Sequence, residues 1–362
     1  MIRGKNMFVG TEVGRRDFLK ISTKVATVLG LSPAFIPKIS AAMQSKDKPA
    51  VIWLHFQECT GCTESLLRAE GPDLAQVILD VISLEYHETL YAAAGHQIED
   101  HLHEAMKRYK GNYVLVVEGA IPTKEGGIYC QIAGKTAVDM LKETAEGCAA
   151  IIAIGSCAGW GGIPSAGPNP TGAVGVSDII KDKPIVSVPG CPPSPYNFLS
   201  TVVHYLLLNK LPTLDEQGRP LFAYGRLIHD QCERRGHFDA GRFANEFGDE
   251  GHRKGYCLYK LGCKGPSTFG NCPEIGFNRQ KTWPVSVGHP CFGCIESKVG
   301  FNQSIHDISE VLSPNPPQQY ADITEADNKP ASMLAAGVVG AAVGGAAAVV
   351  ATKAKNLPGE EE

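Results

Sequence analysis

The stretch Ala50-Val51-Ile52-Trp53-Leu54, followed closely by Glu58-Cys59-Thr60-Gly61-Cys62, decides the fold of the central part of this 362-residue chain. An uninterrupted apolar run of this kind is typical of a strand that is covered on both faces of a parallel sheet. Ligands of open α/β sheets bind beyond the carboxyl ends of such strands. The stretch therefore predicts a parallel sheet with a pair of cysteines at its ligand-binding edge.

Similar apolar runs recur along the chain and alternate with stretches of helical periodicity. The further strands are expected at 113–117, 149–154 and 184–188, with a weaker candidate at 81–86. The helices between them are expected at 65–81, 97–110 and 133–146. This alternation predicts a doubly wound α/β domain over residues 50–208, with a flavodoxin-like parallel sheet.

Residues 209–312 have a different character. They hold half of the twelve cysteines, many glycines and prolines, and no strong periodicity. Apolar burial alone should not hold such an irregular region together, whereas bound metal could stabilise it. We therefore expect a second, irregular domain whose folding depends on metal clusters.

Cysteines follow three of the predicted strands. Cys59 and Cys62 follow the first strand, Cys157 follows 149–154, and Cys191 follows 184–188. Because the carboxyl ends of parallel strands meet at one edge, these four thiols should lie together. Four thiolates around one site are the ligand set of a cubane iron–sulfur cluster.

Two more groups of metal ligands lie in the irregular region. One imidazole and three thiolates, which suit an iron–sulfur cluster or a zinc ion, come from His229, Cys232, Cys257 and Cys263. Three thiolates, which suit a three-iron cluster better than a complete cubane, come from Cys272, Cys291 and Cys294. Cys130 and Cys148 are left over and are expected to be small core residues in helical or helix-edge positions.

Residues 1–42 indicate a targeting segment. A twin arginine stands in Gly14-Arg15-Arg16-Asp17-Phe18-Leu19-Lys20, a weak apolar run covers 21–39, and Ser40-Ala41-Ala42 offers the small residues of a cleavage site. An ordinary basic N-terminus is the alternative. Twin-arginine signals are addresses and not anchors, and they suit a protein that is exported already folded and loaded with its cofactor.

The C-terminal end carries a candidate membrane anchor. Residues 331–351 contain no charge, and at about 1.5 Å a residue this helix would span roughly 30 Å of hydrocarbon. Lys353 and Lys355 follow, as the positive-inside rule favours for an exported protein. We expect a linker at 313–330, an anchor helix at 331–352 and a tail at 353–362; an Ala/Gly-rich tail without a membrane role is the alternative.

Composition narrows the classes of partner and site. The formal net charge of -4 and the lack of a Lys/Arg cluster exclude a nucleic-acid partner. Disulfides are an alternative use of the cysteines in an exported protein, but export in the folded state argues against them. Structural zinc is the other alternative. Three sites on one scaffold with few acidic ligands favour iron–sulfur electron transfer.

The cysteine motifs, taken together, resemble those of one family. The segments that carry the resemblance are Glu58-Cys59-Thr60-Gly61-Cys62-Thr63-Glu64-Ser65, Gly155-Ser156-Cys157-Ala158, Pro189-Gly190-Cys191-Pro192-Pro193 and Gly288-His289-Pro290-Cys291-Phe292-Gly293-Cys294. Over residues 50–312 the chain resembles the small subunit of nickel–iron hydrogenases. The signal and anchor resemble those of the membrane-bound periplasmic uptake enzymes.

The resemblance implies two four-iron clusters and one three-iron cluster in a row. The proximal group would be Cys59, Cys62, Cys157 and Cys191; the medial group Cys272, Cys291 and Cys294; the distal group His229, Cys232, Cys257 and Cys263. Pro284 stands where a fourth medial ligand would otherwise be.

The resemblance also implies the partners and the location. The nickel–iron centre would be on a large-subunit partner, and electrons from H2 would pass through the clusters towards a quinone-linked membrane subunit. The chain would sit on the periplasmic side of the cell membrane, held by a single-pass anchor. An electron-transfer subunit of another respiratory complex is the runner-up. It shares the sheet domain and one cluster, but should lack the second domain.

Overall fold

The computed structural model describes residues 15–43, 48–69, 81–278 and 280–315. Within these residues a five-stranded parallel sheet has the order β2-β1-β3-β7-β9. Its strands are β1 (Ala50–His55), β2 (Ser83–His87), β3 (Tyr113–Glu118), β7 (Cys148–Ile154) and β9 (Ile185–Val188). Counted along the chain, this is the order 2-1-3-4-5 of flavodoxin-like folds, so the predicted topology is confirmed.

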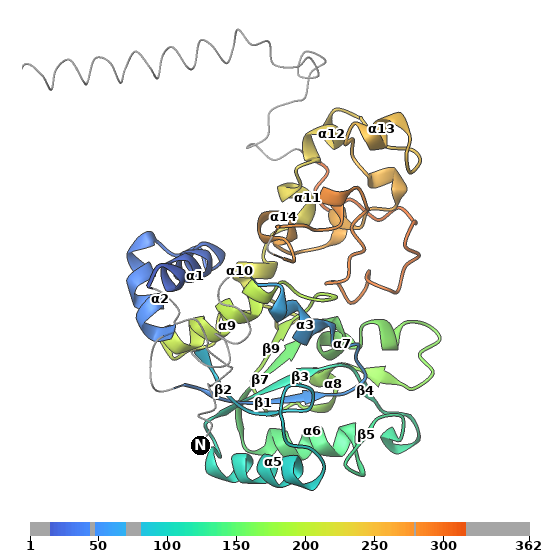
Figure 1. Cartoon of the computed structure of the whole chain (residues 1–362). Helices are drawn as coiled ribbons and strands as arrows, with labels where there is room; N and C mark the ends of the chain where they lie inside the picture. Colours follow the sequence, from blue (N-terminus) through green and yellow to red (C-terminus); the bar gives the residue numbers. More distant parts are fainter. Residues whose placement is uncertain (1–14, 44–47, 70–80, 279, 316–362) are drawn as a thin grey trace, which may run out of the picture.

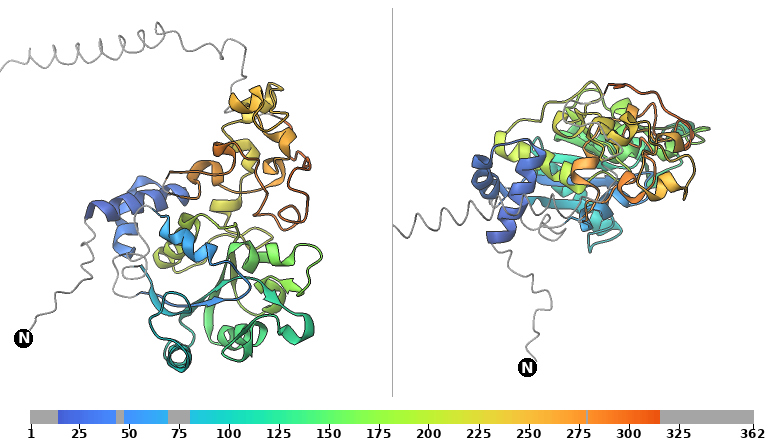
Figure 2. Two further views of the ribbon diagram at one scale, coloured as in Figure 1. Left: turned by 45° about the vertical axis from the view of Figure 1, so that its right-hand side comes forward. Right: turned by 90° about the horizontal axis from the view of Figure 1, so that it is seen from above.

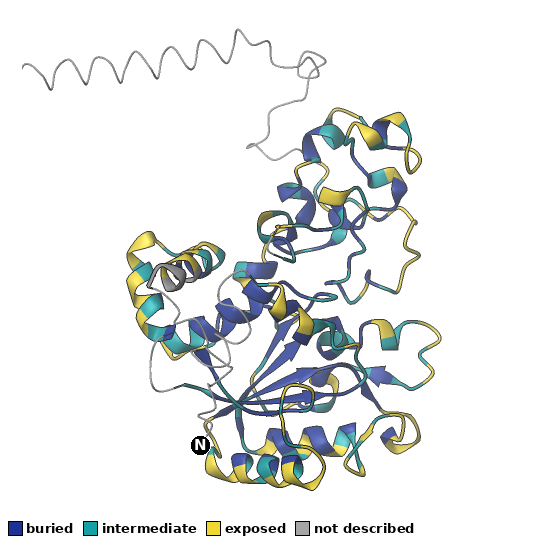
Figure 3. Cartoon of the chain, in the orientation of Figure 1, coloured by how far each residue is buried: buried dark blue, intermediate teal, exposed yellow. Residues whose placement is uncertain are grey.

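The two faces of the sheet are covered by different helices (Figure 1). Helices α5 (His96–Arg108) and α6 (Ala137–Glu146) pack on one face, and α9 (Pro195–Leu208) packs on the other. Successive residues of a strand point to opposite faces. In β1, Ile52 and Leu54 accordingly lie in the core of α5 and α6, while Val51 and Trp53 lie in the core of α9. Both faces of the sheet are buried (Figure 3), which explains the continuous apolar runs.

Short elements complete this part of the chain. They are the helices α3 (Gly61–Leu67), α7 (Gly155–Trp160) and α8 (Val176–Ile179), the antiparallel pair β4 (Ile121–Pro122) and β8 (Ala173–Val174), the hairpin β5 (Gln131–Ile132) and β6 (Lys135–Thr136), and the 3-10 turns η3 (Lys124–Gly127) and η4 (Ile163–Ser165).

The helix expected at 97–110 is His96–Arg108, and the other two predicted helices begin four residues away from their expected starts. The helix expected at 133–146 begins at Ala137, because Gly134 has a positive φ of 80° in the hairpin turn and the Thr136 side chain caps the helix by accepting from the Asp139 N–H at 3.2 Å. The helix expected at 65–81 begins earlier, at Gly61, and ends at Leu67; residues 70–80 lie outside the described residues.

The second half of the chain consists of short helices and loops. These are α10 (Leu221–Tyr224), α11 (Ile228–Gln231), α12 (Arg235–Asp239), α13 (Glu250–Arg253), α14 (Cys272–Ile275), and the 3-10 turns η5 (Tyr259–Leu261), η6 (Gly265–Ser267) and η7 (Val285–Val287). Ile228, Leu258 and Trp283 belong to the same apolar cluster as α9. The irregular region therefore shares a core with the sheet, which the sequence did not indicate.

The N-terminal residues form two helices against the rest of the chain (Figure 2). Helices α1 (Arg15–Val28) and α2 (Ile36–Met43), with the turn η1 (Pro33–Phe35) between them, pack on α9. The expected anchor at 331–352 lies outside the described residues. Among the helices that are described, none has the length and apolar character to cross a membrane.

A buried arginine ties the end of the described chain to the second half of the fold. Arg235 is fully buried and bonds the carboxylates of Asp239 at 2.9 Å and Asp230 at 3.0 Å. It also donates to the carbonyl oxygens of Ser313 at 3.2 Å and Asn315 at 2.5 Å. A buried charge with this many partners is costly to remove, because the partners lose their compensation.

We predict that Arg235→Met lowers the free energy of unfolding by about 1.5–3 kcal/mol, because the partly buried carboxylates of Asp230 and Asp239 lose their charged hydrogen-bond donor. Arg226→Met is the matched control: its ion pair with Glu274, 2.8 Å long, is more than half exposed on both sides and should contribute no more than about 1 kcal/mol. Thermal melts of the two variants, followed by circular dichroism under anaerobic conditions, compare these effects. Equal melting temperatures would contradict the prediction.

Candidate functional site

The carboxyl ends of four strands lie in one register row. His55 pairs with Glu118, Glu118 with Ile154, and Ile154 with Val188. The chain leaves this row at the same edge of the sheet each time. The sequence-predicted thiols follow within a few residues, on the loop after β1, on α3, on α7 and on the loop after β9: Cys59, Cys62, Cys157 and Cys191.

These four thiols, the proximal group, are close enough to affect one another. Burial raises the pKa of Cys62 most, and the negative charges of Glu118 and the other three thiolates raise it further. Burial raises the pKa of Cys157 to about 12, with Cys191 as the next cause. At neutral pH the thiols of Cys62, Cys157 and Cys191 would remain protonated without a cation beside them. The donor set therefore fits a metal centre that replaces the protons.

Glycine is required beside the proximal thiols. Gly162 has a φ of 50°, and a Cβ atom there would lie 2.9 Å from the Cys157 sulfur. Gly155 has a φ of 84°, and a Cβ atom there would collide with the Cys62 sulfur. Side chains at these two positions would occupy the space of the ligands, so the backbone must come close to the site.

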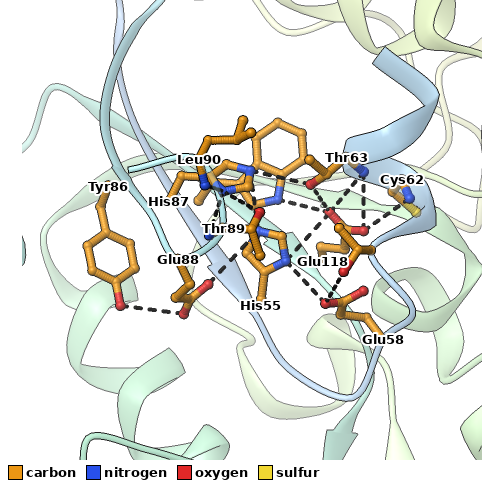
Figure 4. Close-up of polar contacts among 12 residues, drawn as sticks. His55, Glu58, Cys62, Thr63, Tyr86, His87, Glu88, Thr89, Leu90 and Glu118 are labelled. Atoms are coloured by element: carbon orange, nitrogen blue, oxygen red, sulfur yellow. Dashed lines mark hydrogen bonds and ion pairs between the residues drawn. The ribbon is translucent and has the colours of Figure 1, made fainter. Parts of the chain in front are cut away.

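Glu118, at the end of β3, holds the turn that carries the first two cysteines (Figure 4). Its carboxylate is buried and accepts from the N–H groups of Cys62 at 3.0 Å and Thr63 at 3.1 Å, from the Thr63 hydroxyl at 2.6 Å and from Trp53 Nε1 at 3.2 Å. The carboxylate thus compensates the free N–H groups at the start of α3. Sequence reasoning missed this residue, although a charge that ends an apolar strand was the available signal.

A network of histidines and carboxyl groups extends from this clamp (Figure 4). His55 contacts Glu58 at 3.3 Å through Nδ1 and His87 at 3.3 Å through Nε2. Burial lowers the pKa of His87 to about 3 and raises the pKa of Glu88 to about 8. Both groups are therefore mainly uncharged at neutral pH. Burial also lowers the pKa of the buried His55. The Glu118 carboxylate beside Cys62 therefore has no imidazolium at His55 or His87 to compensate its negative charge.

The medial group lines a cavity of about 230 Å³. Cys272, Cys291 and Cys294 all contribute to its wall, and so do Pro284 and Cys191. The remaining lining is almost entirely apolar: Ile228, Thr268, Phe277, Trp283, Phe292, Ile295 and Phe301. Burial raises the pKa of each of the three medial thiols, to about 12 for Cys294. The structure thus brings the three predicted cysteines and Pro284 together around one cavity.

The distal group meets around a second, smaller cavity. His229, Cys232, Cys257 and Cys263 all line it. His229 is 5% exposed, and its Nε2 atom has no hydrogen-bond partner among the described residues. Burial, followed by the nearby Arg235 charge, lowers its pKa to about 4. A neutral imidazole with a free buried nitrogen fits the role of a metal ligand.

Hydrogen bonds connect the three groups in a row. Ser156, next to Cys157, accepts from the Gly190 N–H at 3.0 Å and donates to the carbonyl oxygen of Cys294. At the other end, the Cys291 N–H donates to the Cys263 sulfur at 3.4 Å. The proximal group therefore adjoins the medial group, and the medial group adjoins the distal group.

The structure also bears on the disulfide alternative and on the two remaining cysteines. All twelve cysteines are described as free thiols, which gives the disulfide alternative no support. Cys148 is buried, as expected of a core residue, but it begins β7 and is not helical. Cys130 is half-buried in the turn before β5 and packs against the core of α5 and α6. Neither cysteine lies within a helix. Cys148 directly follows the C-cap of α6 and so lies at a helix edge, as predicted, whereas Cys130 precedes the β5–β6 hairpin.

A flavodoxin-like sheet that leads into three adjoining groups of thiols, of which Cys59 alone is exposed, is the arrangement of a protein that holds metal centres for electron transfer. Residues 224–306 match the family model for the C-terminal part of the NiFe/NiFeSe hydrogenase small subunit, and residues 59–205 match that of the 20 Kd subunit of NADH ubiquinone oxidoreductase. The chain is 51% identical over 346 residues to the hydrogenase-2 small chain of Escherichia coli, a match that covers 95% of this chain and 93% of that one. It belongs to the small-subunit family of nickel–iron hydrogenases.

Two further relatives support this assignment. The quinone-reactive Ni/Fe-hydrogenase small chain of Wolinella succinogenes is 50% identical over 286 residues, 78% of this chain and 80% of that one. The crystal structure of a reduced, active form of the Ni-Fe-Se hydrogenase from Desulfomicrobium baculatum is similar with a TM-score of 0.68 and 37% identity, covering 73% of this chain and 100% of that chain.

We predict that Glu118→Gln lowers the stability of the fold by about 1.5–3 kcal/mol, because charge-assisted hydrogen bonds at the start of α3 are lost. It should also raise the reduction potential at the proximal group, because a buried negative charge favours the oxidised state. Redox titration followed by electron paramagnetic resonance measures the potential. Glu64→Gln on the exposed side of the same helix is the control and should change neither quantity.

Proposed function

We propose that this chain is the electron-transfer small subunit of a membrane-bound periplasmic uptake hydrogenase. The observation that carries the proposal is the unbroken row of proximal, medial and distal groups. Electron transfer over a long distance requires centres placed in succession, and a zinc protein has no need of such a row. The assignment proposed is two four-iron clusters and one three-iron cluster. The four-iron ligands are Cys59, Cys62, Cys157 and Cys191, and His229, Cys232, Cys257 and Cys263; the three-iron ligands are Cys272, Cys291 and Cys294.

The residues of the chain account for what each site must provide. Bound clusters would supply one-electron chemistry, while H2 is split at the nickel–iron site of the family's large subunit. The apolar walls of the medial cavity exclude water, and the buried thiols and imidazole offer only soft or neutral ligands. Pro284 lines the medial cavity together with the three cysteines and would stand in the place of a fourth thiolate that could complete a cubane.

The proposed direction of electron flow follows from the row. The proximal group would face the large subunit, and the distal group would deliver electrons to a membrane redox partner. The name of the Wolinella relative, which describes it as quinone-reactive, supports a quinone-linked partner. The runner-up, an electron-transfer subunit of another respiratory complex, shares the match at 59–205, but the match at 224–306 favours the hydrogenase.

This function predicts that H2 reduces the clusters only in the complex. The chain purified with its large subunit should lose its brown absorbance under H2, and the isolated chain should keep it.

His229→Ala should spare H2-dependent reduction of a small dye at the large subunit but slow reduction of the natural acceptor severalfold, because the exit ligand is lost. A colourless protein, or an unchanged rate with the natural acceptor, would contradict the proposal.

The medial assignment predicts a cluster conversion. Pro284→Cys should place a fourth thiolate in the medial cavity, turn the three-iron cluster into a four-iron cluster and lower its potential, because negative charge is added. Electron paramagnetic resonance of the oxidised protein should show loss of the three-iron signal. A matched Val285→Cys change, at a buried neighbour that does not line this cavity, should leave the signal in place. Persistence of the signal in the Pro284 variant would count against the assignment.

The proposal extends to export and anchoring. Residues 1–42 would be a twin-arginine signal, and residues 331–352 would be a single-pass anchor at the periplasmic side of the cell membrane. Another relative, which is named a periplasmic [NiFe] hydrogenase small subunit, supports this location.

The double change Arg15→Lys and Arg16→Lys should leave the complex in the cytoplasm. Deleting 331–362 should release active complex into the soluble periplasm, and finding it still in washed membranes would mean that something else anchors it.

A further inference from the structure

A buried ion pair lies close to the medial group. Arg219 donates from Nη1 to the Glu296 carboxylate at 2.7 Å, and the two side chains are only 5% and 11% exposed. Glu296 follows the medial residue Cys294 by two positions. Burying two charges is costly, so such a pair is weak evidence of a role in stability. Charges in the interior also act on their neighbours more strongly than charges in water do.

The Glu296 carboxylate connects the two segments that carry the medial thiols. Besides the bond from Arg219, its Oε1 atom accepts from the N–H of Phe269 at 3.0 Å. Phe269 precedes Cys272 by three residues, whereas Glu296 itself follows Cys294. One carboxylate therefore holds together the backbone beside two of the three medial ligands.

Arg219 connects this carboxylate to the sheet. Its Nε atom donates to the carboxylate of Asp215 at 2.7 Å, and both residues belong to the turn 215–219. In the same turn the carbonyl oxygen of Gly218 accepts from the N–H of Ser187, in β9, at 2.8 Å. The medial segments are thus tied to a strand of the sheet through charged hydrogen bonds.

The buried side chain of Tyr224 is close both to Arg219 and to the medial thiols. The guanidinium carbon of Arg219 lies 5.7 Å from the centre of the Tyr224 ring. Burial raises the pKa of Tyr224 well above its ordinary value, and the negative charges of the Cys272 and Cys294 thiolates raise it further. Because Tyr224 is 1% exposed, this region is poorly screened by solvent, and the charge of Arg219 should reach the medial group.

We propose that Arg219 and Glu296 are positioning residues for the medial group, which hold its ligand segments in place and set its reduction potential through their charges. The inference rests on the proposed function, since it takes the medial group to hold a three-iron cluster. Net charge around a cluster is one of the determinants of its potential. Loss of the Glu296 charge should therefore raise the potential, and loss of the Arg219 charge should lower it.

The chain contains a matched control for this pair. Glu274 also follows a medial cysteine, Cys272, by two positions and bonds an arginine, Arg226, at 2.8 Å. These side chains are 51% and 58% exposed, so water and salt screen their charges. The two pairs thus share residue types and spacing from a cysteine but differ in burial.

The test is an anaerobic redox titration of the complex with the large subunit, in which electron paramagnetic resonance follows the oxidised three-iron signal. Glu296→Gln should raise the medial potential and change the shape of the signal, and Arg219→Met should lower the potential. The double variant should return towards the natural value. Glu274→Gln should leave both the potential and the shape unchanged. Iron content per chain, measured on the same samples, shows whether each variant is fully loaded.

The outcomes separate this inference from the proposed function. Equal potentials of the natural complex and the Glu296→Gln variant would overturn the inference, and so would shifts of the same sign in the two single variants. If Arg219→Met does not load its iron, the comparison of Glu296→Gln with Glu274→Gln still decides. Absence of a three-iron signal from the natural complex would instead contradict the proposed medial cluster, and the inference with it.

Discussion

The structure depends on the cost of burying thiolates. Burial raises the pKa of nine of the proposed cysteine ligands. Such sulfurs can be ligands only if a strong cation replaces their protons. The flanking glycines and the apolar cavity walls follow from the same requirement, since they leave room for a large inorganic group and exclude water. In a chain of this kind, metal loading and folding belong to one equilibrium.

Much of the fold and of the site could be predicted because both follow from local rules. Apolar runs identified the strands, and the parallel arrangement then brought Cys59, Cys157 and Cys191 to one edge. What the sequence concealed was long-range. The Glu118 clamp joins residues more than fifty positions apart, and the packing of α1 and α2 on α9 depends on tertiary contacts. The start of α6 was missed because its cap, Thr136, also belongs to a hairpin.

The two segments that match family models position their cysteine and histidine side chains in two different ways. In the sheet region, regular strands fix the ends of the loops, and a few residues suffice to place each thiol. In the second half, short helices such as α11 and α14 carry His229 and Cys272, and the core they share with α9 fixes their positions. The hydrogen bond from Ser156 to the Cys294 carbonyl joins the two halves where their sites adjoin. Relative placement of the proximal and medial groups is thus determined by packing across the whole chain.

The contacts of Arg235 determine where a tether to the proposed membrane anchor would begin. Arg235 lines the distal cavity and also holds the carbonyl oxygens of Ser313 and Asn315. Any tether that continues from Asn315 therefore starts beside the distal group. With the anchor proposed to begin at residue 331, the fifteen intervening residues could reach no farther than about 50 Å even if fully extended. A redox partner in the same bilayer would then meet the electron exit at a high effective concentration, so that even weak docking would sustain rapid turnover.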